Sequence, residues 1–100
     1  MKILEIIHLR LAGRVPDDLI DIIRDSVGSA PDVSAVRIYR HLKLENDLAI
    51  HLHQDTGSDK VTSDVGVRLT AVLKEVGMVS HAVWSERFSL ENGPGPTEDS

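Results

Sequence analysis

The sequence predicts a single small α+β domain whose strands and helices follow in the order βαββαβ. Three observations predict this class: an opening segment that is apolar on both sides, two segments with apolar residues at helical spacing, and two short alternating segments between them. The domain is expected to span residues 1–90. The acidic, Gly- and Pro-rich residues 91–100 are expected to form a disordered tail.

The first two elements are predicted to be a strand and a helix. Residues 2–11 are rich in Ile and Leu and too continuously apolar for one buried face, which is typical of a strand in the middle of a sheet. A helix is expected over residues 16–27, because Pro16 favours a first helical turn and Gly28 favours its end. Two acidic residues directly after Pro16 place negative charge where the helix dipole favours it.

A hairpin is expected next. Residues 36–43 and 48–53 both alternate apolar and polar side chains, as half-buried strands do. The segment between them contains Glu45, Asn46 and Asp47, which are typical turn residues.

A second helix is expected after the hairpin. Its apolar stripe covers residues 61–76, with Ser58 or Asp59 as its cap and Gly77 as its end. Gly66 lies inside this helix at a cost of about 1 kcal/mol relative to alanine. Gly66 is therefore either a tolerated small residue or a point where the helix closely approaches the sheet or a ligand.

The last strand is expected over residues 78–90, with Val79, His81 and Val83 on one face and Ala82, Trp84 and Phe88 on the other. Two right-handed crossovers then give a ferredoxin-like sandwich with the strand order 4-1-3-2 and both helices on one face. The other face of the sheet would be too apolar to lie in water. We therefore expect a homodimer in which two sheets face each other.

This arrangement over residues 2–90, with its short hairpin and an aromatic-bearing last strand, resembles the dimeric α+β barrel superfamily. In outline it is most similar to the antibiotic-biosynthesis-monooxygenase-like and stress-responsive barrel proteins. The resemblance rests on topology and on no diagnostic motif. The superfamily includes cofactor-free oxygenases, isomerases and haem-handling enzymes, so the resemblance implies no single activity and no catalytic residue.

Composition excludes several classes of function. The net charge is −5 and only 3% of residues are aromatic, which disfavours binding to a nucleic-acid backbone or stacking on bases. Cysteine is absent, which excludes disulfides, thiolate metal ligands and thiol nucleophiles. No segment approaches the roughly 20 apolar residues of a membrane span, and charged residues interrupt the apolar N-terminus too early for a signal peptide. A cytoplasmic protein that binds neither nucleic acid nor membranes is expected.

The hairpin contains the candidate functional residues. If the apolar faces of its strands are matched, Leu42 lies opposite Ile50 and Leu44 lies opposite Leu48. This register also pairs His41 with His51, and Tyr39 with His53. These four polar side chains form the candidate ligand-binding site: Tyr39, His41, His51 and His53. A neutral histidine can accept a proton near neutral pH, and a tyrosine can donate to a developing oxyanion.

Three hypotheses about function remain open. The first is a small dimeric domain that binds a small molecule or serves assembly, and it needs no cofactor. The second is a cofactor-independent monooxygenase- or isomerase-like enzyme that uses the hairpin histidines. The third is a divalent metal site, with Zn²⁺ held by His41, His51 and His53 and one coordination position open.

Overall fold

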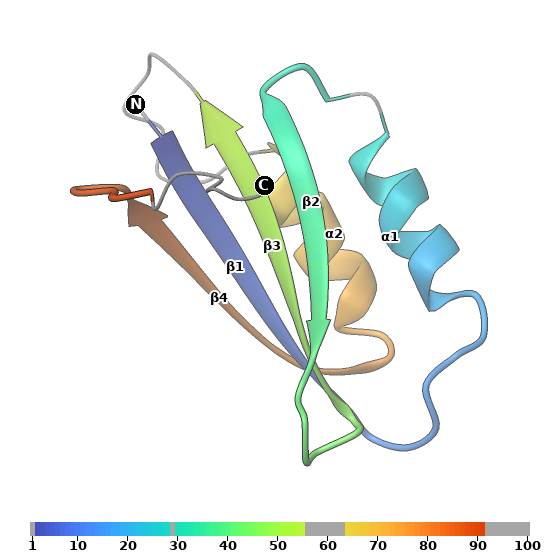
Figure 1. Cartoon of the computed structure of the whole chain (residues 1–100). Helices are drawn as coiled ribbons and strands as arrows, with labels where there is room; N and C mark the ends of the chain where they lie inside the picture. The colour runs from blue at the N-terminus through green and yellow to red at the C-terminus, as the bar shows by residue number, and fades with distance from the viewer. Residues whose placement is uncertain (1, 29, 56–63, 92–100) are drawn as a thin grey trace, which may run out of the picture.

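The computed structural model describes residues 2–28, 30–55 and 64–91. Four strands form one antiparallel sheet, and two helices lie against one of its faces (Figure 1). The elements are β1 (Lys2–Leu11), α1 (Leu19–Val27), β2 (Val33–Arg40), β3 (Asp47–Asp55), α2 (Asp64–Leu73) and β4 (Gly77–Ser85). The order of the strands across the sheet is β2-β3-β1-β4. This confirms the predicted ferredoxin-like α+β fold and the predicted strand order 4-1-3-2.

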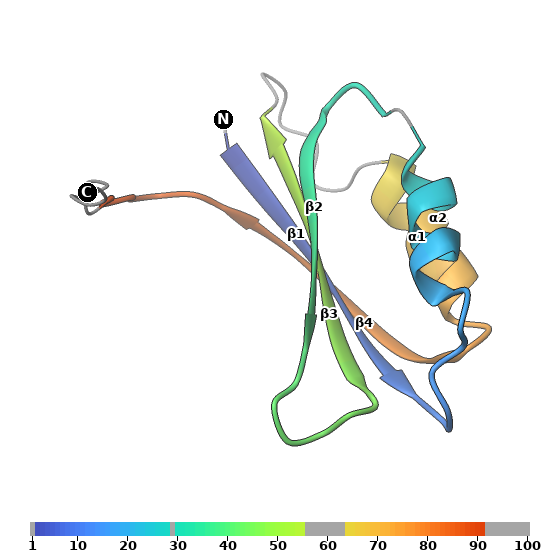
Figure 2. The same cartoon turned by 45° about the vertical axis from the view of Figure 1, so that its right-hand side comes forward.

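β1 occupies the centre of the sheet and pairs with β3 on one side and β4 on the other. Its odd-numbered side chains point toward the helices, and Ile7 and Leu9 among them are fully buried. Its even-numbered side chains lie on the opposite face, where Leu4 and Ile6 are half-buried. The strand is therefore apolar on both sides, because one side meets the helices and the other forms the middle of a face that neither α1 nor α2 covers (Figure 2).

The core lies between the sheet and the two helices. Its helical residues are Leu19 and Ile23 from α1, and Val65, Leu69 and Leu73 from α2. They pack on the helix-facing side chains of the central strands. The amphipathic stripes recognised in the sequence therefore set which face of the sheet is covered.

The start of α1 and the end of α2 differ from the predicted residues. α1 begins at Leu19 instead of Pro16, because the preceding residues form a turn in which the Leu19 N–H donates to the Pro16 carbonyl at 3.1 Å. Its predicted end is confirmed: Gly28 has a φ of 59°, and its N–H donates to the Arg24 carbonyl. α2 ends at Leu73, and Gly77 instead begins β4. The predicted caps Ser58 and Asp59, and the stripe residue Val61, lie outside the described residues.

The predicted register of the hairpin is wrong. Ile38, not Leu42, lies opposite Ile50, and Arg37 lies opposite His51. β2 accordingly spans Val33–Arg40 instead of residues 36–43, and residues 41–46 form the connecting loop. The observed register places the side chains of β2 that pack best, Val36 and Ile38, against the core and leaves Leu42 in solvent.

The last strand is also shorter than predicted, ending at Ser85 instead of residue 90. Its faces are as expected, because His81 pairs with Ile7 on the helix side and Trp84 pairs with Leu4 on the other side. Residues 86–91 are exposed and lead away from the sheet on the side opposite the helices (Figure 2). The predicted tail beyond residue 91 lies outside the described residues.

Candidate functional site

The uncovered face of the sheet combines an apolar centre with polar groups around it. Its apolar side chains come from the two central strands and β4: Leu4, Ile6, Ala49, Ala82 and Trp84. Trp84 is the only tryptophan of the chain, and 60% of it is exposed. An aliphatic centre and a large exposed ring on one face of a small domain mark an interaction surface or a ligand site.

Three of the four predicted site residues meet on this face. The ring of Tyr39 on β2 lies 4.7 Å from the ring of His51 on β3, measured between centroids. The ring of His53 lies 6.3 Å from that of His51, again between centroids. The observed register keeps them together because it differs from the predicted one by an even number of residues, so the same side chains stay on the same face.

His41 is not part of this cluster. It lies in the loop after β2, where its Nδ1 accepts hydrogen bonds from the backbone N–H groups of Lys43 (3.0 Å) and Leu44 (3.1 Å). The backbone N–H of His41 donates to the backbone carbonyl of Asp47. His41 therefore stabilises the loop, and the predicted pairing of His41 with His51 is wrong.

The three-histidine zinc site is consequently not formed. With His41 in the loop, only His51 and His53 share the face. Within residues 2–28, 30–55 and 64–91, no group of three or more His, Asp or Glu side chains is placed to hold a metal ion. The predicted Zn²⁺ site of His41, His51 and His53 is therefore wrong.

Arg37 joins the cluster from β2. Its Nη1 lies 3.2 Å from the Nε2 of His53. Since a guanidinium can only donate, Nε2 of His53 is the acceptor of this hydrogen bond. The cluster therefore offers a cation, a phenol and two imidazoles within one surface, which is a suitable set for a small molecule with an acidic group.

Burial lowers the pKa of His51 below its ordinary value of 6.5, and positive charge on His53 lowers it further. Between the lowered pKa and 6.5 the unfolded chain binds more protons at this site than the folded chain. We therefore expect the free energy of unfolding to fall as the pH drops below about 6.5, and this slope to be shallower in His51→Gln. Urea unfolding midpoints at a series of pH values measure the slope.

Tyr39→Phe is the matched control for this pH experiment, because it alters the neighbouring ring without removing a group that titrates near neutral pH. Equal slopes in the wild type and His51→Gln would contradict the assignment of the acid sensitivity to this ring.

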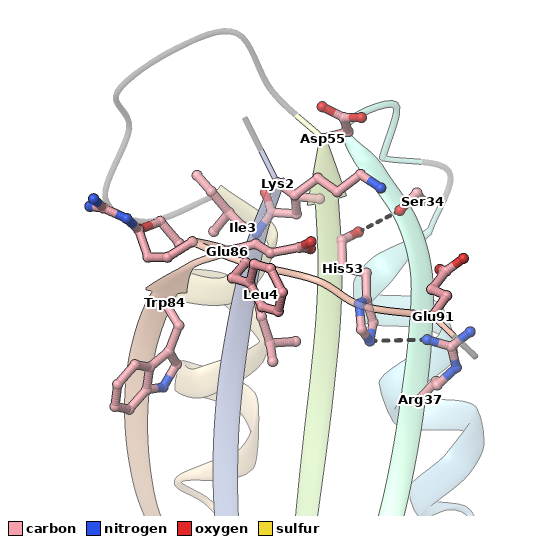
Figure 3. Close-up of a pocket in the computed structure, with 14 residues that line it drawn as sticks. Lys2, Ile3, Leu4, Ser34, Arg37, His53, Asp55, Trp84, Glu86 and Glu91 are labelled. Carbon is pink, nitrogen blue, oxygen red and sulfur yellow. Dashed lines mark hydrogen bonds between the residues drawn. The ribbon is translucent and has the colours of Figure 1, made fainter.

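A half-open pocket of about 940 Å³ extends from this cluster toward one end of the sheet (Figure 3). Arg37 and His53 line it from one side, and Trp84 lines it from β4. The residues that follow β4 add Phe88 and Glu91 to its wall. The pocket thus has aromatic surface and a positively charged group on opposite sides.

The other end of the uncovered face is held by an ion pair. Arg10 on β1 donates from Nε and Nη2 to the two carboxylate oxygens of Asp47 on β3, at 3.0 and 3.1 Å. The hydrogen bond from Arg10 holds the pKa of Asp47 below its usual range, although burial opposes this shift. Asp47, predicted as a turn residue, instead opens β3 and fixes its register against β1.

A second polar cluster on the helix-facing side of the sheet was not anticipated. Glu5 is fully buried there, with Gln54 and His81 at hydrogen-bond distance. The sequence signal was present, because Glu5 shares the odd-numbered phase of β1 with the core residues Ile3 and Ile7. An acidic residue at a core-facing position is rare enough to single out.

No family model matches the chain, and no curated protein matches its sequence. Solved structures do match its fold. Rv0793 from Mycobacterium tuberculosis superposes with a TM-score of 0.66 at 10% identity, covering 91% of this chain and 100% of that one. A putative antibiotic biosynthesis monooxygenase from Bordetella bronchiseptica gives 0.64 at 10% identity, with coverage of 87% and 98%.

A variant of SnoaB, a cofactor-independent oxygenase from Streptomyces nogalater, gives a TM-score of 0.67 at 12% identity, covering 91% of this chain and 98% of that one. The chain has the fold of the antibiotic-biosynthesis-monooxygenase-like proteins. This confirms the resemblance to the dimeric α+β barrel superfamily at the level of fold. At such low identity the likeness does not transfer an activity or a ligand.

Proposed function

We propose that this chain is a small-molecule-binding domain that works as a homodimer in the cytoplasm. The observation that carries the proposal is the pocket on the uncovered sheet face, where Arg37 and His53 lie on one side and Trp84 on the other. None of the helices within the described residues is long and apolar enough to cross a membrane.

The chemistry of the pocket favours a planar ligand with an acidic group. The guanidinium of Arg37 is suited to a carboxylate or phenolate, and the indole of Trp84 is suited to an apolar ring. His53 is already within hydrogen-bond distance of Arg37 and can add a second polar contact. No metal or organic cofactor is required for such binding.

Trp84 supplies a direct readout, because it lines the pocket and is the only tryptophan of the chain. Benzoate is a suitable first probe, since it combines a ring with a carboxylate. We expect benzoate to change the Trp84 fluorescence in a saturable way, and Arg37→Gln to weaken this binding about tenfold through loss of a charge-assisted hydrogen bond.

Arg40→Gln is the control for the benzoate titration, because Arg40 also lies on β2 but pairs with Leu48 and does not line the pocket. Equal affinities in the two variants would remove Arg37 from the site. A fluorescence that does not respond to benzoate in the wild type would argue against an aromatic acid as the ligand class.

A cofactor-independent enzyme that uses Tyr39, His51 and His53 is the second candidate. The observation that favours it is the close packing of a phenol on an imidazole of lowered pKa, which leaves His51 neutral and able to accept a proton at neutral pH. SnoaB, which shares this fold at 12% identity, is a cofactor-independent oxygenase, and this supports the chemical class.

A further inference from the structure

The buried polar cluster on the helix side of the sheet consists of Glu5, Gln54 and His81. Gln54 donates from Nε2 to Oε1 of Glu5 at 2.7 Å. The second carboxylate oxygen, Oε2, lies 2.6 Å from Nε2 of His81. A contact this short between a carboxylate oxygen and a ring nitrogen holds one proton between the two groups.

Keeping a carboxylate at this position costs stability. Glu5 is fully buried beside core residues such as Ile7 and Leu52. Apolar side chains of similar volume commonly replace a buried ion pair with no loss of stability, or with a gain. An apolar side chain of the same size would fill this position at least as well, so the need to fill space in the core does not explain a glutamate here.

Gly66 on α2 adds a second cost at the same place. A Cβ at this position would overlap the carboxylate of Glu5, so only glycine lets the helix lie against it. Glycine inside a helix costs about 1 kcal/mol relative to alanine. Two local costs that meet at one pair of titratable groups are typical of a site retained for function.

The pair is also reachable from solvent. His81 lies on β4, which is an edge strand, and 20% of its side chain is exposed. No hydrogen-bond partner for its other ring nitrogen, Nδ1, is found within the described part of the chain. The buried carboxylate thus holds Nε2 of the ring, while part of the same side chain is exposed to solvent.

We propose that Glu5 and His81 form a proton-transfer pair, in which Nδ1 of His81 accepts a proton from a small molecule with an acidic O–H group, such as a phenol or an enol. The O–H bond breaks, its electron pair stays on the oxygen as an oxyanion, and the proton forms an N–H bond at Nδ1. The resulting imidazolium keeps its Nε2–H on the carboxylate of Glu5, which stabilises the new positive charge.

Glu5 is a positioning residue in this proposal, because it acts on the ligand only through the ring of His81. Gln54 in turn holds the carboxylate. The step moves one proton and leaves oxidation states unchanged, so it needs no further reactant. This site is on the opposite face of the sheet from the Trp84 pocket, and the proposal is independent of benzoate binding there.

The first test needs no variant. Diethyl pyrocarbonate acylates unprotonated ring nitrogens, and mapping of the modified peptides locates the products. We expect His81 to be modified in the folded wild type, and its rate to fall about tenfold in Glu5→Gln, which keeps the size of the side chain but removes the carboxylate that holds Nε2 of the ring. Complete protection of His81 in the folded protein would overturn the proposal.

The second test uses p-nitrophenol, whose anion alone absorbs visible light. We expect the wild type to increase the anion fraction at slightly acidic pH, His81→Gln to abolish the increase, and Glu5→Gln to reduce it severalfold. Arg40→Gln, on β2 and outside both the Trp84 pocket and the Glu5–His81 pair, should leave the spectrum unchanged. Equal spectra for the wild type and His81→Gln would show that the pair only links the strands.

Discussion

Ile6→Lys is expected to convert a dimer of this chain into a monomer. Ile6 lies in the middle of the uncovered face, with His51 opposite it on β3 and Ala82 opposite it on β4. A twofold interface through this face would bury two lysine charges without partners, and each would cost several kcal/mol. The dissociation constant should therefore rise by at least about 100-fold.

Sedimentation equilibrium measures the outcome, because one chain has a mass of 11.0 kDa and a dimer has twice that. Val67→Lys is the matched control. It makes the same kind of change on α2, where Val67 is 55% exposed to solvent. A wild type that sediments as a monomer at high concentration, or a dimer that survives Ile6→Lys but not Val67→Lys, would contradict association through the sheet.

The order of the elements was predictable because the spacing of apolar residues follows which faces of the strands and helices are buried. β1 shows this directly: its odd positions meet the helices and its even positions form the centre of the other face, so its whole sequence is apolar. The ends of elements were less predictable. α1 starts late because its proline-led turn satisfies the backbone before the helix begins, and β4 stops at Ser85 although apolar residues follow it.

The candidate site was predicted only in part. The wrong hairpin register, which put His41 beside His51, has a physical cause. Apolar matching cannot distinguish registers that differ by an even number of residues, since each keeps the same side chains in the core. Leu42 and Ile38 were both suitable partners for Ile50, and Ile38 is the one observed. The hydrogen bonds of His41 to Lys43 and Leu44 hold it in the connecting loop of the observed register, and no alternation pattern reveals them.

The polar cluster around Glu5 could not be predicted from the alternation of apolar and polar residues either. Glu5 is the single acidic residue of an apolar strand and looks like a mere interruption of it, although its odd-numbered position places it in the core. Its partners His81 and Gln54 lie on two other strands, so only the tertiary pairing brings the three together. The sequence did offer one clue, Gly66, and of its two interpretations the structure confirms the close approach of helix to sheet.

Gly66→Ala is therefore expected to destabilise the domain by about 1–3 kcal/mol, even though alanine is the better helix former. The new Cβ would overlap the carboxylate of Glu5, which is fully buried and held by Gln54 and His81, so it cannot move into solvent. Unfolding by urea, followed by circular dichroism, gives the change in free energy.

A double-mutant cycle with Glu5→Ala isolates this collision from the effect of alanine on the helix. In the Glu5→Ala background the carboxylate is gone, so Gly66→Ala should become neutral or stabilise the domain by up to about 1 kcal/mol. The coupling between the two positions should thus exceed about 1 kcal/mol and favour the double variant. If Gly66→Ala had the same effect in both backgrounds, Gly66 would not be there to admit Glu5. The glycine would then give no support to the view that the buried pair of Glu5 and His81 is retained for function.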